Sequence, residues 1–121
     1  MKTIQKLLLS VTVIAACTQT PVWAHASLEI AVPGKNAQLT APPKEVALHF
    51  NESVEANFSS IKVLDAGGKT VSMKKATVDS ADPKTLRARI GTLKSGRYTV
   101  QWVGVGRDGH RRTGDYQFTV K

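Results

Sequence analysis

The chain has 121 residues, 17 of them Lys or Arg against nine Asp or Glu, and it contains one cysteine. This length suffices for one small domain, and a single cysteine excludes an intramolecular disulfide. The positive residues are scattered rather than clustered on one segment, so we interpret most of the charge as a solvated surface and expect no nucleic-acid partner.

The amino-terminal segment has the pattern of an export signal. Met1–Lys6 carries two lysines, Leu7–Ala16 is apolar, and Val22-Trp23-Ala24 places small residues at the −3 and −1 positions. An apolar run of about ten residues is too short to span a bilayer of about 30 Å. We therefore expect residues 1–24 to be a cleaved signal peptide, residues 25–121 to form the mature domain, and the protein to reside in the periplasm.

A competing prediction concerns Cys17. The segment Ile14-Ala15-Ala16-Cys17 resembles a bacterial lipobox, in which the cysteine is lipidated and becomes the first residue. The protein would then be anchored to a membrane, and His25 would lie inside the chain. Cleavage after Ala24 instead removes Cys17, so that the mature domain has neither a disulfide nor a thiolate ligand.

Beyond residue 25, apolar and polar residues alternate with a period of two, which is typical of strands with one buried face. In chain order the runs are Val46–Phe50, Ile61–Val63, Leu86–Ile90, Tyr98–Trp102 and Tyr116–Val120. Turn-forming residues such as Pro33-Gly34, Gly67-Gly68, Asp82-Pro83 and Ser95-Gly96 lie between or before these runs. The spacing predicts an all-β fold, an antiparallel β-sandwich of immunoglobulin type with about seven strands and no disulfide.

The most pointed local motif is Asp108-Gly109-His110. A glycine between a carboxylate and an imidazole lets the backbone turn and direct both side chains at one point. Taken alone, the motif is equally typical of an ordinary surface turn, because Asp-Gly is a common turn sequence.

His25 changes this interpretation, because cleavage after Ala24 makes it the first residue. An amino-terminal histidine offers two nitrogen donors, the α-amine and the ring Nδ1, which close a chelate ring on a metal. Together with Asp108 and His110 it forms a set of three nitrogens and one oxygen, which suits Cu(II). We therefore predict one Cu(II) per chain, bound by His25, Asp108 and His110.

Two further polar residues follow or interrupt the run that ends at Phe50. Glu52 is a candidate for an additional or axial ligand, or for a residue that orients a ligating ring; it could equally be a solvated acid at a strand end. His49 lies on the face opposite Leu48 and Phe50, and we interpret it as a surface histidine outside the metal site.

Motifs through the whole mature chain resemble those of the CopC-type periplasmic copper-binding and copper resistance proteins, which include YobA-like members. The matching segments are His25–Leu28, Pro33-Gly34, Leu39–Pro42, Val46–Glu52, Leu93–Trp102, Asp108–His110 and Gly114–Val120. The resemblance implies a Greek-key β-sandwich, a Cu(II) site and a role in copper resistance, homeostasis or delivery. By position, His25, Asp108 and His110 match the Cu(II) ligands, and Glu52 matches an acid that some members place at or near that metal.

The chain departs from the family pattern in two respects. Many members hold Cu(I) with a methionine-rich loop, whereas Met73 is the only methionine after the signal, so we expect no Cu(I) methionine site. Arg107 and Arg111 flank the Asp-Gly-His motif and place positive charge beside the metal. The resemblance also makes a CopD-type inner-membrane copper transporter a plausible partner.

Two other functions compete with a non-enzymatic, monomeric copper carrier. An amino-terminal histidine on a β-sandwich is also typical of copper polysaccharide monooxygenases. The mature chain leaves little room for a substrate platform, however, and Asp108 would fill a position that oxygen chemistry needs open. The third possibility is a membrane-associated interaction module in which metal binding is incidental.

Overall fold

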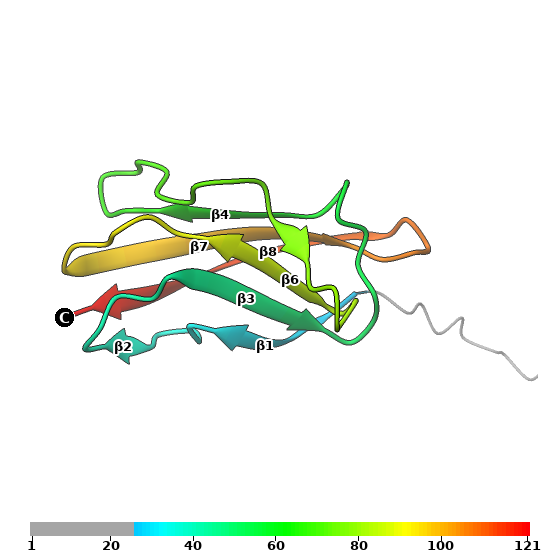
Figure 1. Cartoon of the computed structure of the whole chain (residues 1–121), viewed down its shortest axis with the longest axis horizontal. Helices are drawn as coiled ribbons and strands as arrows, with labels where there is room; N and C mark the ends of the chain where they lie inside the picture. Colours follow the sequence, from blue (N-terminus) through cyan, green and yellow to red (C-terminus); the bar gives the residue numbers. More distant parts are fainter. Residues whose placement is uncertain (1–25) are drawn as a thin grey trace, which may run out of the picture.

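The computed structural model describes residues 26–121, which form two packed four-stranded sheets (Figure 1). The first sheet has the order β1-β3-β6-β5, with bounds Leu28–Val32, Glu45–Phe50, Thr85–Arg89 and Thr77–Val78. The second has the order β2-β8-β7-β4, with bounds Gln38–Leu39, Arg111–Val120, Gly96–Val105 and Ser60–Leu64. The predicted signal peptide, Cys17 and His25 lie outside the described residues.

The core lies between the sheets and is built from the alternating apolar residues. Along β3, Val46, Leu48 and Phe50 are fully buried, whereas the residues between them are more exposed. The predicted runs in β4, β6, β7 and β8 supply most of the other buried side chains, among them Ile61, Val63, Leu86, Ala88, Tyr98, Val100, Tyr116, Phe118 and Val120. The predicted all-β sandwich and its buried faces are therefore confirmed.

The strand pairing differs from the prediction in detail. Residues 26–121 form eight strands, close to the predicted seven, and the pair β2–β8 is parallel, whereas the other paired strands are antiparallel. β2 has only two residues, too few to show an alternation in the sequence. Hydrogen bonds from Thr119 N to Ala37 O (2.8 Å) and from Lys121 N to Leu39 O (2.8 Å) hold this short segment against the edge of β8.

The hairpin of β7 and β8 is the longest element of the fold, and glycines let large rings pack closely against it. Each strand has ten residues, paired from Gly96↔Val120 to Val105↔Arg111. A Cβ on Gly104 would lie 2.9 Å from the Phe50 ring, and one on Gly114 would lie 2.6 Å from the Trp102 ring. The end of β3 is thereby packed against the far end of the hairpin, where the Asp-Gly-His motif lies.

The part of the chain that the structure describes contains no helix long and apolar enough to cross a membrane.

Candidate metal centre

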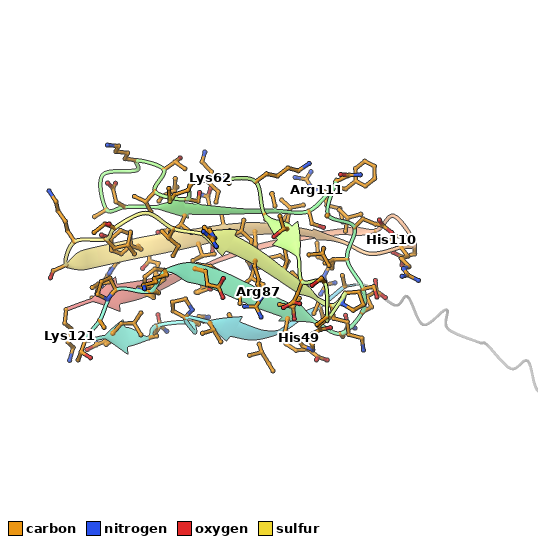
Figure 2. All side chains as sticks on the ribbon, viewed as in Figure 1. His49, Lys62, Arg87, His110, Arg111 and Lys121 are labelled. Atoms are coloured by element: carbon orange, nitrogen blue, oxygen red, sulfur yellow. The ribbon has the colours of Figure 1, made fainter. Side chains whose placement is uncertain are left out.

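The loop that joins β7 to β8 carries two of the predicted ligands, and Figure 2 shows His110 at this tip of the hairpin. Gly109 N donates to Gly106 O (3.0 Å), and His110 N donates to Asp108 Oδ1 (3.0 Å). Gly109 adopts φ +81°, a left-handed conformation that costs glycine little. The turn is therefore held by its own hydrogen bonds, as the Asp-Gly sequence predicts.

The turn brings the side chains of Asp108 and His110 into direct contact. Asp108 Oδ2 lies 2.8 Å from His110 Nδ1, and both side chains are more than a third exposed. Two donors at about 2.0 Å from one ion and at a right angle to each other are separated by about 2.8 Å. The spacing of this pair therefore fits two ligands of a single metal ion, and it equally fits a carboxylate that orients the imidazole.

Glu52 reaches the same place from the other sheet. The segment that follows β3 runs beside the hairpin, with a bridge between Val54 and Gly106 and a hydrogen bond from Glu55 N to Val105 O (2.8 Å). The Glu52 carboxylate lies directly over Gly106, where a Cβ would overlap its Oε1 atom and would come within 3.1 Å of Asp108 Oδ1. The absence of a side chain at Gly106 thus makes room for both carboxylates.

Glu52 Oε1 is a buried oxygen without a donor. Within the described residues it has no hydrogen-bond partner. A buried carboxylate oxygen normally accepts a hydrogen bond or binds a cation, because removing it from water is otherwise costly. The unsatisfied Glu52 Oε1 lies next to Asp108, so these two carboxylates fit a site for a cation.

The start of the described chain is anchored beside these residues. Ser27 N donates to the side-chain oxygen of Asn51 at 2.7 Å, and Asn51 N donates to Ser27 O at 3.0 Å. Ala26 is fully buried in the core. Asn51 therefore fixes the backbone two residues after His25, at the end of β3 that also leads into Glu52. The sequence alone singled out neither Asn51 nor Gly106, although each lies within two positions of a candidate ligand.

Positive side chains surround the candidate ligands. A cavity of about 440 Å³ is lined by Asn51, Glu52, Ser53, Lys84, Arg107 and Asp108. Among residues 26–121, neither Lys84 nor Arg107 forms an ion pair. Their charges raise the electrostatic potential at the two carboxylates, which opposes a cation and favours an anion or an acidic partner near it.

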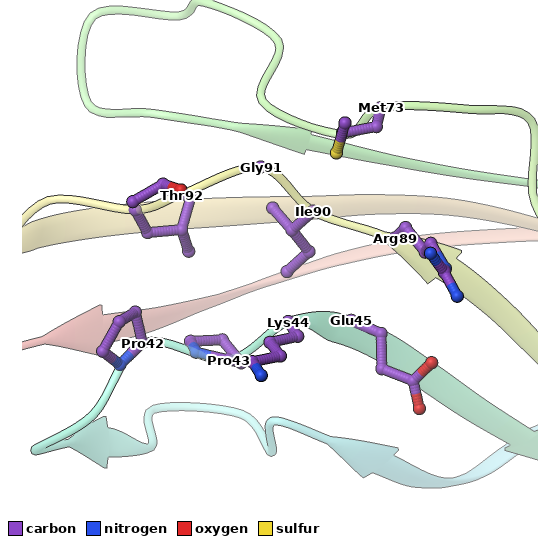
Figure 3. A pocket seen from close by; sticks show the side chains of 10 residues that line it. Pro42, Pro43, Lys44, Glu45, Met73, Arg89, Ile90, Gly91 and Thr92 are labelled. Carbon is purple, nitrogen blue, oxygen red and sulfur yellow. The ribbon is translucent and has the colours of Figure 1, made fainter.

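The remaining predicted features lie elsewhere. His49 is on the outer face of β3, where it contacts Asp82 and Thr85. Met73 is 64% exposed and lines a cavity of about 770 Å³ near the start of β3 (Figure 3). No three His, Cys, Asp or Glu side chains within residues 26–121 form a metal-binding group.

Comparison with known proteins adds an independent line of evidence. The family model described as the CopC domain matches residues 28–121. Protein YobA of Escherichia coli (strain K12) is 41% identical over 101 residues, which cover 83% of this chain and 82% of that protein. Copper resistance protein C of Pseudomonas syringae pv. tomato is 32% identical over 81% of this chain and 82% of its own length.

Solved structures of similar proteins share the fold. CopC from Methylosinus trichosporium OB3b superposes with a TM-score of 0.75 at 36% identity, covering 80% of this chain and 94% of that structure. PcoC, a methionine-rich copper resistance protein from Escherichia coli, gives a TM-score of 0.72 at 32% identity, covering 81% of this chain and all of that structure.

Proposed function

The chain belongs to the CopC family, and we propose that it is a periplasmic Cu(II)-binding protein acting in copper resistance, homeostasis or delivery. Support for copper as the cargo comes from the names of its relatives, which include copper resistance protein C and the copper transport protein CutJ of Bacillus subtilis. One Cu(II) binds tightly per chain. The amine and imidazole of His25, together with Asp108 and His110, are its ligands, and Glu52 is an additional or axial ligand.

The observation that carries the proposal is the unsatisfied Oε1 of Glu52, which lies with Asp108 over Gly106. Two carboxylates held this close repel each other; Lys84 and Arg107, which line the same cavity, offset part of this repulsion, and a bound metal ion would offset more of it. The imidazole of His110 adds a nitrogen donor at 2.8 Å from Asp108. Mixed nitrogen and carboxylate donors suit Cu(II), which heads the affinity series of the divalent metals.

Asn51 supports the participation of His25. Its two hydrogen bonds with Ser27 hold the backbone at the end of the sheet where Glu52 begins. In this proposal, the free α-amine of His25, two residues before Ser27, joins Asp108 and His110 at the metal. The proposal therefore requires cleavage after Ala24, since any residue added before His25 removes the amine as a donor.

Copper titration of correctly processed protein tests this function. We expect one tightly bound Cu(II) with a type 2 EPR signal and nitrogen hyperfine coupling. One extra residue before His25 lowers the Cu(II) affinity by about 100-fold or more, since loss of a ligand costs at least as much as loss of the residue that orients it. An unchanged affinity in the extended protein would show that the amine is not a ligand.

Export and anchoring are tested on the protein made in a bacterial cell. We propose removal of residues 1–24 and release into the periplasm. Intact mass spectrometry would then show a chain that starts at His25, whereas a diacylglyceryl mass on Cys17 would show a lipoprotein and would remove the chelate.

We propose a carrier rather than an enzyme, with a CopD-type inner-membrane transporter as its partner and a monomer as its working form. Copper-loaded protein supplied with ascorbate and polysaccharide should release no oxidised sugars. Oxidised products above those of free copper would instead establish a copper-dependent oxidative enzyme.

A further inference from the structure

His49 is the centre of a polar cluster on the outer face of the first sheet, separate from the hairpin tip. Its Nδ1 lies 3.1 Å from Asp82 Oδ2 and 3.0 Å from Thr85 Oγ1, and its Nε2 lies 4.0 Å from Glu29 Oε2. The cluster connects β1, β3 and the segment before β6. Figure 2 places His49 at the β1 side of the sandwich, near the point where the chain enters it.

The hydrogen bonds determine which nitrogen of His49 carries the proton. The Thr85 hydroxyl donates to Asp82 Oδ2 at 2.7 Å, so its oxygen is left to accept. Asp82 is a carboxylate and also accepts, from Lys84 N at 3.1 Å. Since both neighbours of Nδ1 are acceptors, Nδ1 carries the proton, and Nε2 of the neutral ring has an available lone pair.

This arrangement resembles that of metal-binding histidines in general, in which a carboxylate accepts a hydrogen bond from one ring nitrogen while the other binds the metal. The His49 side chain is 31% exposed and, with Glu45 and Arg87, lines a groove of about 320 Å³. The distance of 4.0 Å to Glu29 Oε2 exceeds a hydrogen bond. A metal ion between these two atoms could lie about 2.0–2.2 Å from each, which is a normal metal–ligand distance.

The positive charge of Arg87 on this face is engaged by residues other than His49 and Glu29. Arg87, the nearest cation on β6, is bound by Asp79 at 2.9 Å and by Glu45 at 2.7 Å. Its positive charge is therefore compensated locally. The Glu29 side chain is 53% exposed and can rotate toward Nε2 at little cost.

We propose that His49 Nε2 and Glu29 bind a second divalent metal ion, preferentially Cu(II), with Asp82 and Thr85 as positioning residues for the imidazole. Only two protein ligands are present, so water completes the coordination and the affinity is far lower than at the first site. Imidazole with carboxylate suits Cu(II) and Zn(II), and Cu(II) binds more tightly. The site gives the protein additional copper capacity when copper is in excess, and it does not depend on His25.

Copper titration of the mature protein with matched histidine variants tests this site, with circular dichroism to verify folding. Wild type should bind a second, weaker Cu(II) whose EPR spectrum shows one coordinated imidazole. His49→Ala should lose this equivalent and keep the first, whereas His110→Ala should weaken the first and keep the second. Asp82→Asn should weaken the second equivalent by about 10–100-fold, as expected for a residue that orients a ligating ring.

Two results would overturn the proposal: a second equivalent that is unchanged in His49→Ala, or saturation of wild type at one Cu(II) with millimolar copper present. If no protein, wild type included, binds the tight Cu(II), but a His49-dependent Cu(II) is still bound, the amino-terminal site would be refuted. The proposal for His49 and Glu29 would then still stand.

Discussion

Replacing Gly106 with alanine tests whether the two carboxylates at the hairpin tip bind the metal. The new Cβ would overlap Glu52 Oε1 and lie 3.1 Å from Asp108 Oδ1. Ordinary contacts between carbon and oxygen are about 3.5 Å, so Glu52 must retreat by roughly an ångström or more, and Asp108 by a few tenths. The substitution therefore moves both carboxylates without altering either of them chemically.

The expected loss of copper affinity follows from this displacement. Ligands of a metal site tolerate only small shifts, and disturbing the residues that hold them typically costs about 10–100-fold in affinity. At about 1.4 kcal/mol per factor of ten, this corresponds to about 1.4–2.8 kcal/mol of binding free energy. Competition with a chromogenic Cu(II) chelator measures the affinity, and EPR reports the change in the donor set.

A matched control separates this effect from general damage to the fold. A Cβ on Gly91 would make only ordinary contacts, 3.7 Å from Val71 O and 3.9 Å from Met73, at the other end of the sandwich. Gly91→Ala should therefore bind copper as wild type does. Equal Cu(II) affinity in Gly106→Ala and Gly91→Ala would refute the placement of the carboxylates at the metal.

Three further predictions concern other parts of the chain. Asn51→Ala should weaken Cu(II) binding by about 10-fold, because the Ser27 amide loses its hydrogen-bond acceptor. Asn51→Asp keeps an acceptor oxygen and should retain most of the Cu(II) affinity. Equal affinity in wild type and both variants would exclude this positioning role. Gly114→Ala places a Cβ 2.6 Å from the Trp102 ring and should cost about 1–3 kcal/mol in urea unfolding, whereas an unchanged midpoint would mean that the ring moves freely. Hydrogen bonds from the Ala81 amide and the Arg87 guanidinium lower the pKa of Asp79 below its ordinary value of 3.8. The stabilisation that Asp79 provides is therefore present above pH 3.8 and is lost as the pH falls through the lower pKa of Asp79 in the folded protein. Asp79→Asn should accordingly show a smaller fall in melting temperature between about pH 4 and pH 2 than wild type.

The sequence alone determined the fold class and most of the buried faces. Alternation with a period of two depends only on the pleat of a strand, so Val46, Leu48 and Phe50 could be assigned to the core before any pairing was known. The turn at Asp108-Gly109 was equally predictable, because it depends on neighbouring residues and on a glycine that adopts positive φ. Short strands such as β2 could not be predicted, because two residues show no alternation.

Contacts between residues far apart in the chain were decided only by the tertiary structure. Glu52 meets Asp108 because β3 and the hairpin belong to opposite sheets that pack through Phe50 and Gly104, a pairing that no local pattern records. The same holds for His49, which sequence analysis placed on the surface. Its ring is oriented by Asp82 and Thr85, which lie more than 30 positions later in the chain. Local chemistry could thus nominate donors, whereas the packing of the two sheets decided which of them share a site.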